Sequence, residues 1–116
     1  MKKGEIMHRF GRIIELSLLT LLRKDDGYGY KLANDLIMYN LIDKSVNIGL
    51  IYRALRNLES KGLIDSYWED SNDGPNKRIY RINEKGVTET NHMLELLKER
   101  RKHIDTIINL NSNLED

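Results

Sequence analysis

Cysteine is absent from the 116-residue chain, and proline, tryptophan and phenylalanine occur once each. Without thiols the chain has neither a disulfide framework nor a thiolate metal site, which suits a reducing cytoplasm. No apolar run approaches the ~18 residues that a membrane-spanning helix needs. The basic start of the chain leads into an apolar stretch that Arg12, Glu15 and Ser17 interrupt, so we expect no signal peptide.

An excess of charge of one sign is also lacking. Nineteen basic residues face 18 acidic ones, so the net charge neither indicates nor excludes a nucleic-acid partner, and only the distribution of charge is informative. The length suits one domain with a single core. Hydrophobic residues make up 40% and charged residues 32% of the chain, which favours a soluble, helix-rich fold.

The most informative stretch, residues 45–82, begins with the pattern of a helix. Asn47 is a candidate N-cap, and Gly62 ends the pattern because glycine tolerates the positive φ that is common just beyond a helix. One face is apolar with spacing i, i+4, i+7 and consists of Ile51, Leu55 and Leu58. A second face is polar and basic and consists of Arg53, Arg56, Asn57 and Ser60.

Two β-rich runs follow, at residues 63–69 and 78–82, and turn-forming residues separate them. They predict a hairpin in which Trp68 and Tyr80 share a face and pair across the strands. We expect Trp68 to belong to the core of this hairpin rather than to stack on a ligand. A helix with an apolar back and a basic front, followed by a hairpin with a basic tip, is typical of the recognition half of a winged helix-turn-helix.

Three further helices complete a mainly α fold with a two-stranded β-wing (α+β). Residues 9–24 are apolar over so much of the helix circumference that they need cover on more than one side, from a partner chain or as the central core helix of a monomer. Residues 29–39 precede the recognition helix and complete the helix-turn-helix order. From Asn83, a candidate N-cap, a last helix of about 26 residues spans roughly 39 Å. Gly86 in its first turn suggests close approach of the wing, since glycine otherwise costs ~1 kcal/mol there.

The closing helix is too long for the preceding domain to cover. We therefore expect a winged domain at residues 1–83 and a dimerisation helix at 84–116, with a second copy in two-fold symmetry as the partner. The apolar residues of this homodimer either simply pack its interface or, if the helices leave a gap, line a pocket for a small effector. The residues predicted for the dimer interface or pocket are Met7, Phe10, Ile14, Met93, Leu96, Leu97 and Ile104.

In order and spacing, residues 11–86 resemble the PadR family of transcriptional regulators. The residues that carry the resemblance are Gly29-Tyr30, Ile51-Tyr52, Leu55, Leu58-Glu59, Gly62-Leu63-Ile64, Trp68, Gly74-Pro75, Lys77-Arg78, Tyr80-Arg81-Ile82 and Glu84-Lys85-Gly86. The resemblance implies a cytoplasmic prokaryotic DNA-binding regulator with a C-terminal dimerisation helix, usually a repressor released by a small molecule. A single short closing helix is similar to the small subgroup of the family, some members of which respond to drug-like or aromatic compounds.

A recognition helix places its N-terminal half against base edges in the major groove of double-stranded DNA. Arg53 is the predicted reader of guanine, whereas Arg56 either grips phosphate or bonds locally to Glu59 or Ser60. The start of the second helix would meet the DNA backbone, and the wing tip would meet the minor groove or phosphates unless it is a merely solvated turn. The predicted DNA-binding residues are Tyr30, Lys31, Asn47, Gly49, Leu50, Tyr52, Arg53, Arg56, Asn76, Lys77 and Arg78. A dimer would bind a palindromic operator.

Leu50 departs from the family pattern, in which a small hydroxyl residue usually occupies this position. Leucine can only touch a thymine methyl or pack against protein. Leu50 is the one sequence feature that favours an alternative function, a winged-helix adaptor for protein interaction or plasmid segregation without ligand control.

An enzyme is a further class of function, and nothing in the sequence favours it. The chain has no Gly-rich phosphate loop and no paired nucleophile and base. His92 follows Glu89 at i, i+3 and His103 follows Glu99 at i, i+4, which is far from the paired Glu-x-x-His set of a di-iron bundle. We therefore expect no catalytic residue, no metal and no cofactor.

Overall fold

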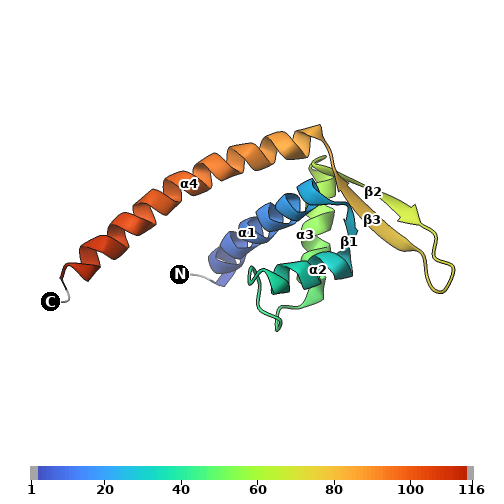
Figure 1. Cartoon of the computed structure of the whole chain (residues 1–116), viewed down its shortest axis with the longest axis horizontal. Coiled ribbons are helices and arrows are strands. Elements are labelled where there is room, and N and C mark those ends of the chain that lie inside the picture. Colours follow the sequence, from blue (N-terminus) through green and yellow to red (C-terminus); the bar gives the residue numbers. More distant parts are fainter. Residues whose placement is uncertain (1–2, 115–116) are drawn as a thin grey trace.

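The computed structural model describes residues 3–114 and the side chains of residues 13–114. The described residues form, in chain order, α1 (Lys3–Lys24), β1 (Gly27–Tyr28), α2 (Gly29–Met38), α3 (Ile48–Ser60), β2 (Ile64–Glu69), β3 (Lys77–Ile82) and α4 (Glu84–Ser112) (Figure 1). The predicted mainly α fold with a β-wing is confirmed. The first helix begins earlier than predicted, at Lys3 rather than at residue 9.

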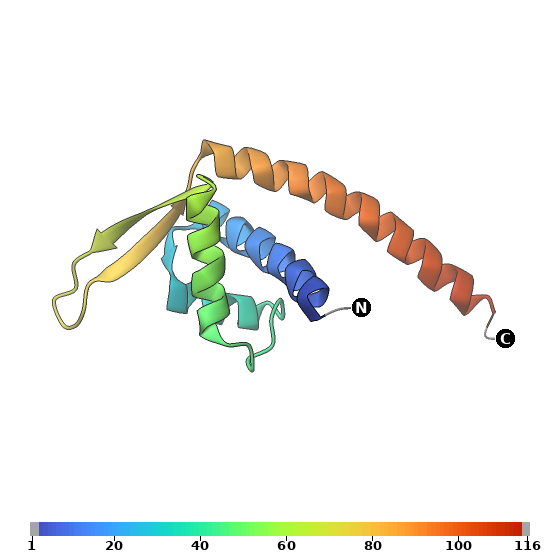
Figure 2. The ribbon, with the colours of Figure 1, turned by 180° about the vertical axis from the view of Figure 1, so that it is seen from behind.

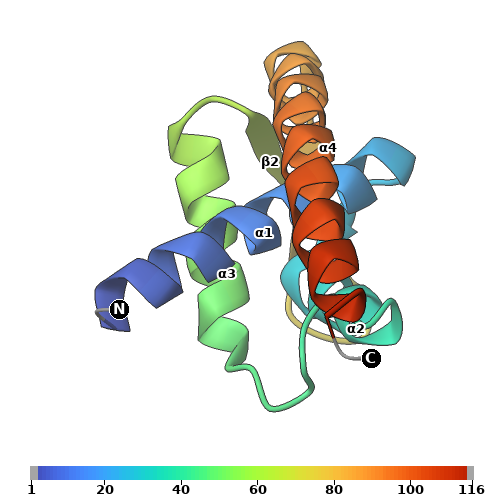
Figure 3. The ribbon, with the colours of Figure 1, turned by 90° about the vertical axis from the view of Figure 1, so that its left-hand side faces the viewer.

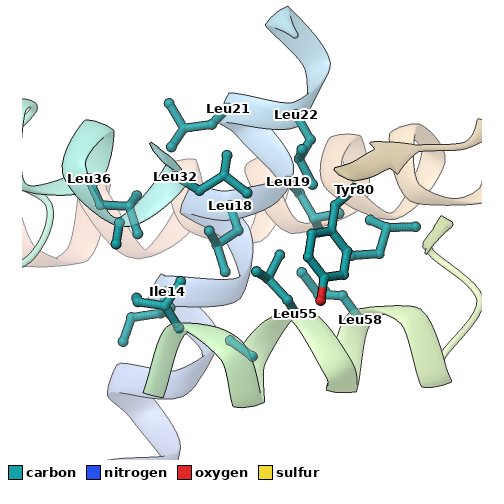
Figure 4. Close-up of a cluster of buried hydrophobic side chains, with 14 of the residues drawn as sticks. Ile14, Leu18, Leu19, Leu21, Leu22, Leu32, Leu36, Leu55, Leu58 and Tyr80 are labelled. Carbon is teal, nitrogen blue, oxygen red and sulfur yellow. The ribbon is translucent and has the colours of Figure 1, made fainter. Parts of the chain in front are cut away.

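The core lies where α1, α2 and α3 meet the base of the β2–β3 hairpin. Leu18 of α1, Leu36 of α2 and Leu55 of α3 are fully buried, and Tyr80 of β3 covers the cluster from the side of the sheet (Figure 4). Each such leucine contributes about 1.5–3 kcal/mol by leaving water. Burial of the apolar stripe of α3 determines which face of this helix turns outward.

The predicted helix caps are all present. The side-chain oxygen of Asn47 accepts a hydrogen bond from the backbone N–H of Gly49 at 2.8 Å and caps α3. Gly62, just beyond α3, has φ of +76°, which favours glycine. The side-chain oxygen of Asn83 accepts from the backbone N–H of Gly86 at 2.9 Å and caps α4.

Gly86 also confirms the predicted close approach between the wing and the last helix. A Cβ added at Gly86 would collide with the backbone carbonyl oxygen of Leu63 and would lie 2.7 Å from Ile82. The Asn83 amide meanwhile donates to the Gly62 carbonyl at 3.0 Å. The start of α4 is therefore held against the turn between α3 and β2.

The sheet has three antiparallel strands in the order β1-β3-β2, so the hairpin gains one strand beyond the two predicted. The additional strand pairs Gly27 with Tyr80 and Tyr28 with Ile79. Two residues are too few to show the alternation that marks a strand in sequence. β1 ties the hairpin to the junction between α1 and α2.

The prediction for Trp68 was wrong. The register places Tyr80 opposite Ser66 and Trp68 opposite Arg78, and the Trp68 side chain is 66% exposed. The reason is that the hairpin projects beyond the body of the protein (Figures 1 and 2). Within its two strands, only Ile64, Ile79 and Tyr80, toward the base, are buried.

The last helix extends far beyond the domain, giving the protein dimensions of 63 × 31 × 27 Å. α4 packs on α1 only near its start, where Arg23 donates to the Asn91 side chain at 3.0 Å, and α1 lies between α3 and α4 (Figure 3). All described residues from 95 onward are exposed. The large apolar residues among them are Leu96, Leu97, Ile104, Ile107, Ile108, Leu110 and Leu114.

Candidate nucleic-acid interface

The outward face of α3 presents two arginines to solvent. Arg53 and Arg56 are both exposed because the opposite stripe of the helix is buried in the core. Neither guanidinium forms a hydrogen bond or ion pair with any described side chain, so the local bond considered for Arg56 is not formed there. Tyr52, 38% exposed, lies on the same face. This face can therefore donate hydrogen bonds to an external partner.

The first residues of α3 contribute less to this face than the sequence suggested. The side chain of Asn47 and the N–H of Gly49 are already bonded to each other in the cap. Leu50 is half-buried and packs against the core. Packing explains an apolar residue at this position, and whether Leu50 also contacts DNA stays a prediction.

The start of α2 lies beside α3 and adds a hydroxyl and an ammonium group. Tyr30 is 58% exposed. Lys31 pairs with Asp35 at 3.4 Å, an i, i+4 contact between exposed side chains. Surface ion pairs of this kind contribute little to stability, so the ammonium group of Lys31 can leave Asp35 and bind another anion.

Arg78 of the wing is engaged within the protein. Its Nη2 donates to Oε1 of Glu59 at 2.9 Å, and its Nε donates to Oγ of Ser66 at 3.0 Å. The guanidinium also lies 5.7 Å from the ring centroid of Tyr80, whose pKa is raised by burial and partly lowered again by the charge of Arg78. The sequence motifs did not reveal Glu59 as a wing contact, because its partner lies 19 residues further along the chain.

Lys77 and Asn76, the other predicted wing residues, lie at the tip of the hairpin. Lys77 is exposed, with its Nζ 4.4 Å from the ring centroid of Tyr28. The side-chain oxygen of Asn76 accepts from the backbone N–H of Ser71 at 3.4 Å within the loop. At the tip, the Lys77 ammonium group therefore contacts an aromatic ring and forms no ion pair with a described residue.

The outer face of the hairpin is attached to the α1–β1 junction. The hydroxyl of Tyr67 donates to Asp26 at 3.0 Å, and this carboxylate raises the pKa of Tyr67. The guanidinium of Arg81 lies 5.5 Å from the Tyr67 ring centroid. Both faces of the hairpin therefore have contacts with the body of the protein.

A groove of about 740 Å³ lies between α1, the end of α2 and the loop before α3. Its lining is Ile13, Ile14, Ile37, Asn40, Leu41, Ile42, Asp43, Lys44, Val46 and Leu50. Of the residues predicted to line a pocket, Ile14 is in this groove. Met93 packs partly on the core, whereas Leu96, Leu97 and Ile104 are exposed on α4. Met7 and Phe10 lie outside the residues whose side chains are described.

Two other kinds of feature, a metal site and a membrane-spanning helix, are not found in the part of the chain that the structure describes. Among those residues, no three His, Cys, Asp or Glu side chains are grouped closely enough to hold a metal ion. No helix within them is both long and apolar enough to cross a membrane.

The sequence matches the model of the transcriptional regulator PadR-like family over residues 18–92, well over half of the chain. A PadR-like transcription factor from Bacteroides fragilis has a similar structure, with 24% identity, a TM-score of 0.75, and coverage of 91% of this chain and 99% of that one. A PadR family regulator from Clostridium difficile R20291 is 28% identical, with a TM-score of 0.60 over 84% of this chain and 95% of that one. Bacillus subtilis PadR, solved with operator DNA, is 24% identical, with a TM-score of 0.64 over 72% of this chain and 47% of that one. These comparisons confirm the family resemblance predicted from sequence.

Proposed function

The chain belongs to the PadR-like family of transcriptional regulators, and from this premise we propose that it binds operator DNA through the exposed face of α3 and the β2–β3 wing. The observation that carries the proposal is the pair of exposed guanidiniums of Arg53 and Arg56, which have no anionic partner among the described side chains. Arginine on a groove-bound helix can bind guanine O6 and N7 in bidentate fashion. Bacillus subtilis PadR, which shares the fold, was solved in complex with operator DNA, and this supports operator DNA as the partner. A regulator, rather than an enzyme, is also what the family implies.

We further propose that the protein is a homodimeric repressor acting in the cytoplasm of a prokaryote, with residues 84–116 as its dimerisation helix. Support comes from the apolar side chains that α4 exposes beyond residue 95, including Leu97 and Ile104. A two-fold dimer presents two copies of α3, and such dimers bind palindromic sites with half-sites ~34–36 Å apart.

Titration of the protein against a labelled duplex from the promoter of its own gene tests DNA binding. Because released counterions drive association, an interface with 6–10 phosphate contacts should lose about 10³–10⁵-fold in affinity between 50 and 200 mM salt. A scrambled duplex of the same length is the control and should bind more weakly. Absence of binding to either duplex at 50 mM salt would favour the adaptor function instead.

Release of the repressor from DNA by an effector depends on how the two α4 helices of the dimer pack together. If they leave a gap, the apolar residues Met93, Leu96, Leu97 and Ile104 are available to line it, and methionine suits an adaptable pocket. Calorimetry with planar aromatic compounds should then show heat of binding, and the melting temperature should rise with compound concentration. No heat and no shift in melting temperature would mean that these residues only pack the dimer.

A further inference from the structure

We propose that Arg78 is a positioning residue, which together with Glu59 and Ser66 holds the wing at a set orientation to α3, and that Lys77 is the wing cation that meets phosphate. This inference rests on the proposed DNA-binding function. It assigns different roles to two neighbouring basic residues that the sequence grouped together.

The three side chains form a closed set of hydrogen bonds. Arg78 donates to Glu59 at 2.9 Å and to Ser66 at 3.0 Å, while the Ser66 hydroxyl donates to the second carboxylate oxygen of Glu59 at 2.6 Å. Both carboxylate oxygens are used, and the bonds to charged groups are of the short, strong kind. The set joins three elements, α3, β2 and β3.

The hydrogen-bonded set of Glu59, Ser66 and Arg78 lies at a place on the hairpin where it can restrict movement of the wing relative to α3. The core holds the base of the hairpin at Ile64 and Tyr80, and the last buried residue toward the tip is Ile79. The bonds of Glu59 to Ser66 and Arg78 are the only side-chain hydrogen bonds between α3 and the strands of the hairpin within the described residues. The outer face is tied to the α1–β1 junction instead, through Tyr67 and Asp26. On the side of the hairpin that faces α3, the side-chain bonds that hold the wing at its angle to the recognition helix are therefore those of Glu59.

Arg78 and Lys77 differ in whether their positive charge is neutralised within the protein. The carboxylate of Glu59 neutralises Arg78, whereas the Lys77 ammonium group lies over the uncharged ring of Tyr28 and forms no ion pair with a described residue, Glu69 on the opposite strand included. A guanidinium already paired with a carboxylate neutralises little phosphate charge, so it displaces few of the cations condensed on DNA. An exposed ammonium group that meets phosphate releases about 0.9 counterion, which appears in the slope of affinity against salt.

The first test needs no DNA. Trp68 is the only tryptophan in the chain and lies opposite Arg78 on the neighbouring strand, so its fluorescence anisotropy reports the motion of the wing. Depolarisation should become faster in Glu59→Ala and in Arg78→Lys, because lysine keeps the charge but lacks the planar fork of arginine. Glu69→Ala removes another wing carboxylate, one without an ion pair among the described residues, and should leave the anisotropy unchanged. Equal anisotropy in all four proteins would overturn the inference.

The second test measures affinity for the operator duplex across a range of salt concentrations. Lys77→Gln should reduce the slope of log affinity against log salt by about one per protomer, and so by about two for a dimer on its operator, whereas Arg78→Gln should weaken binding with the wild-type slope. Glu59→Ala should weaken binding although it removes a negative charge near DNA, and Glu69→Ala should not weaken it. A reduced slope in Arg78→Gln, rescue of affinity by Arg78→Lys, or tighter binding by Glu59→Ala would overturn the inference.

The two tests separate failure of the inference from failure of the proposed function. If the wild-type protein binds no duplex, the proposed function is wrong, and the anisotropy of Trp68 still reports whether Glu59 and Arg78 hold the wing. Melting curves of every variant verify folding, since Glu59 and Arg78 are 29% and 43% exposed and lie outside the core.

Discussion

Ile104→Glu should convert the protein from dimer to monomer and abolish cooperative occupation of both operator half-sites. Ile104 is 48% exposed in the middle of the part of α4 that extends beyond the domain. Leu97, Ile104 and Ile108 recur at i, i+7 and i+11, which places them on one face of the helix. A second copy of α4 lying on this face would bury Ile104.

The expected effect is large because two-fold symmetry introduces two glutamates into one apolar interface. The penalty for removing an unpaired carboxylate from water is several kcal/mol, so the dissociation constant of the dimer should rise at least ~1,000-fold. Sedimentation velocity across a concentration series measures this directly. The free energy of unfolding of the winged domain should change little, because α4 leaves the core before residue 95.

Thr106→Glu is the matched control for this prediction. It introduces the same charge two residues further on, which is about 200° around the helix from Ile104. It should leave the protein dimeric and its operator affinity unchanged. A wild-type protein that sediments as a monomer, or equal dissociation in both variants, would refute the proposed role of α4.

Arg53→Ala should remove much of the sequence preference of the protein while leaving its non-specific binding largely intact. Arg53 projects from the exposed face of α3, less than two turns after the Asn47 cap. A bidentate arginine–guanine contact contributes ~1–3 kcal/mol of discrimination, so the ratio of operator to scrambled-duplex affinity should fall by about 5–150-fold for each half-site contacted. Competition titrations with both duplexes measure the ratio.

The comparison variant is Lys77→Ala, which removes an exposed wing cation rather than a base reader. It should weaken binding to all duplexes by the same factor and leave the ratio of affinities unchanged. If Arg53→Ala and Lys77→Ala lose affinity equally on every duplex, the roles assigned to these two residues are wrong.

Features that depend on residues close together in the chain were predictable from sequence. The apolar stripe of α3 and the caps at Asn47 and Asn83 involve partners within a few residues. Gly62 similarly marks its own backbone conformation. The resemblance then extended these local patterns to the winged fold and to the regulator family, and residues 18–92 match that family.

Contacts between elements that are far apart in the chain could not be predicted from the sequence in the same way. Whether Trp68 is buried depends on how far the hairpin projects past the core. The alternation of residues in the sequence is the same whether the hairpin projects far or only a little. The contact of Arg78 with Glu59 spans 19 residues and requires the wing to lie beside the C-terminal end of α3. Strand β1 gains its pairing only from β3, more than 50 residues later.

By itself, the sequence determined where α2, α3 and α4 begin, which face of α3 turns to solvent, and to which regulator family the chain belongs. Tertiary structure alone decided that Leu50 packs inward, that Trp68 is exposed, and that Arg78 is bound to Glu59 while Lys77 has no anionic partner among the described side chains. The physical reason is that helix periodicity and capping are set by hydrogen bonds within one or two turns. The surroundings of a side chain on a projecting hairpin are set instead by the packing of elements far apart in the chain.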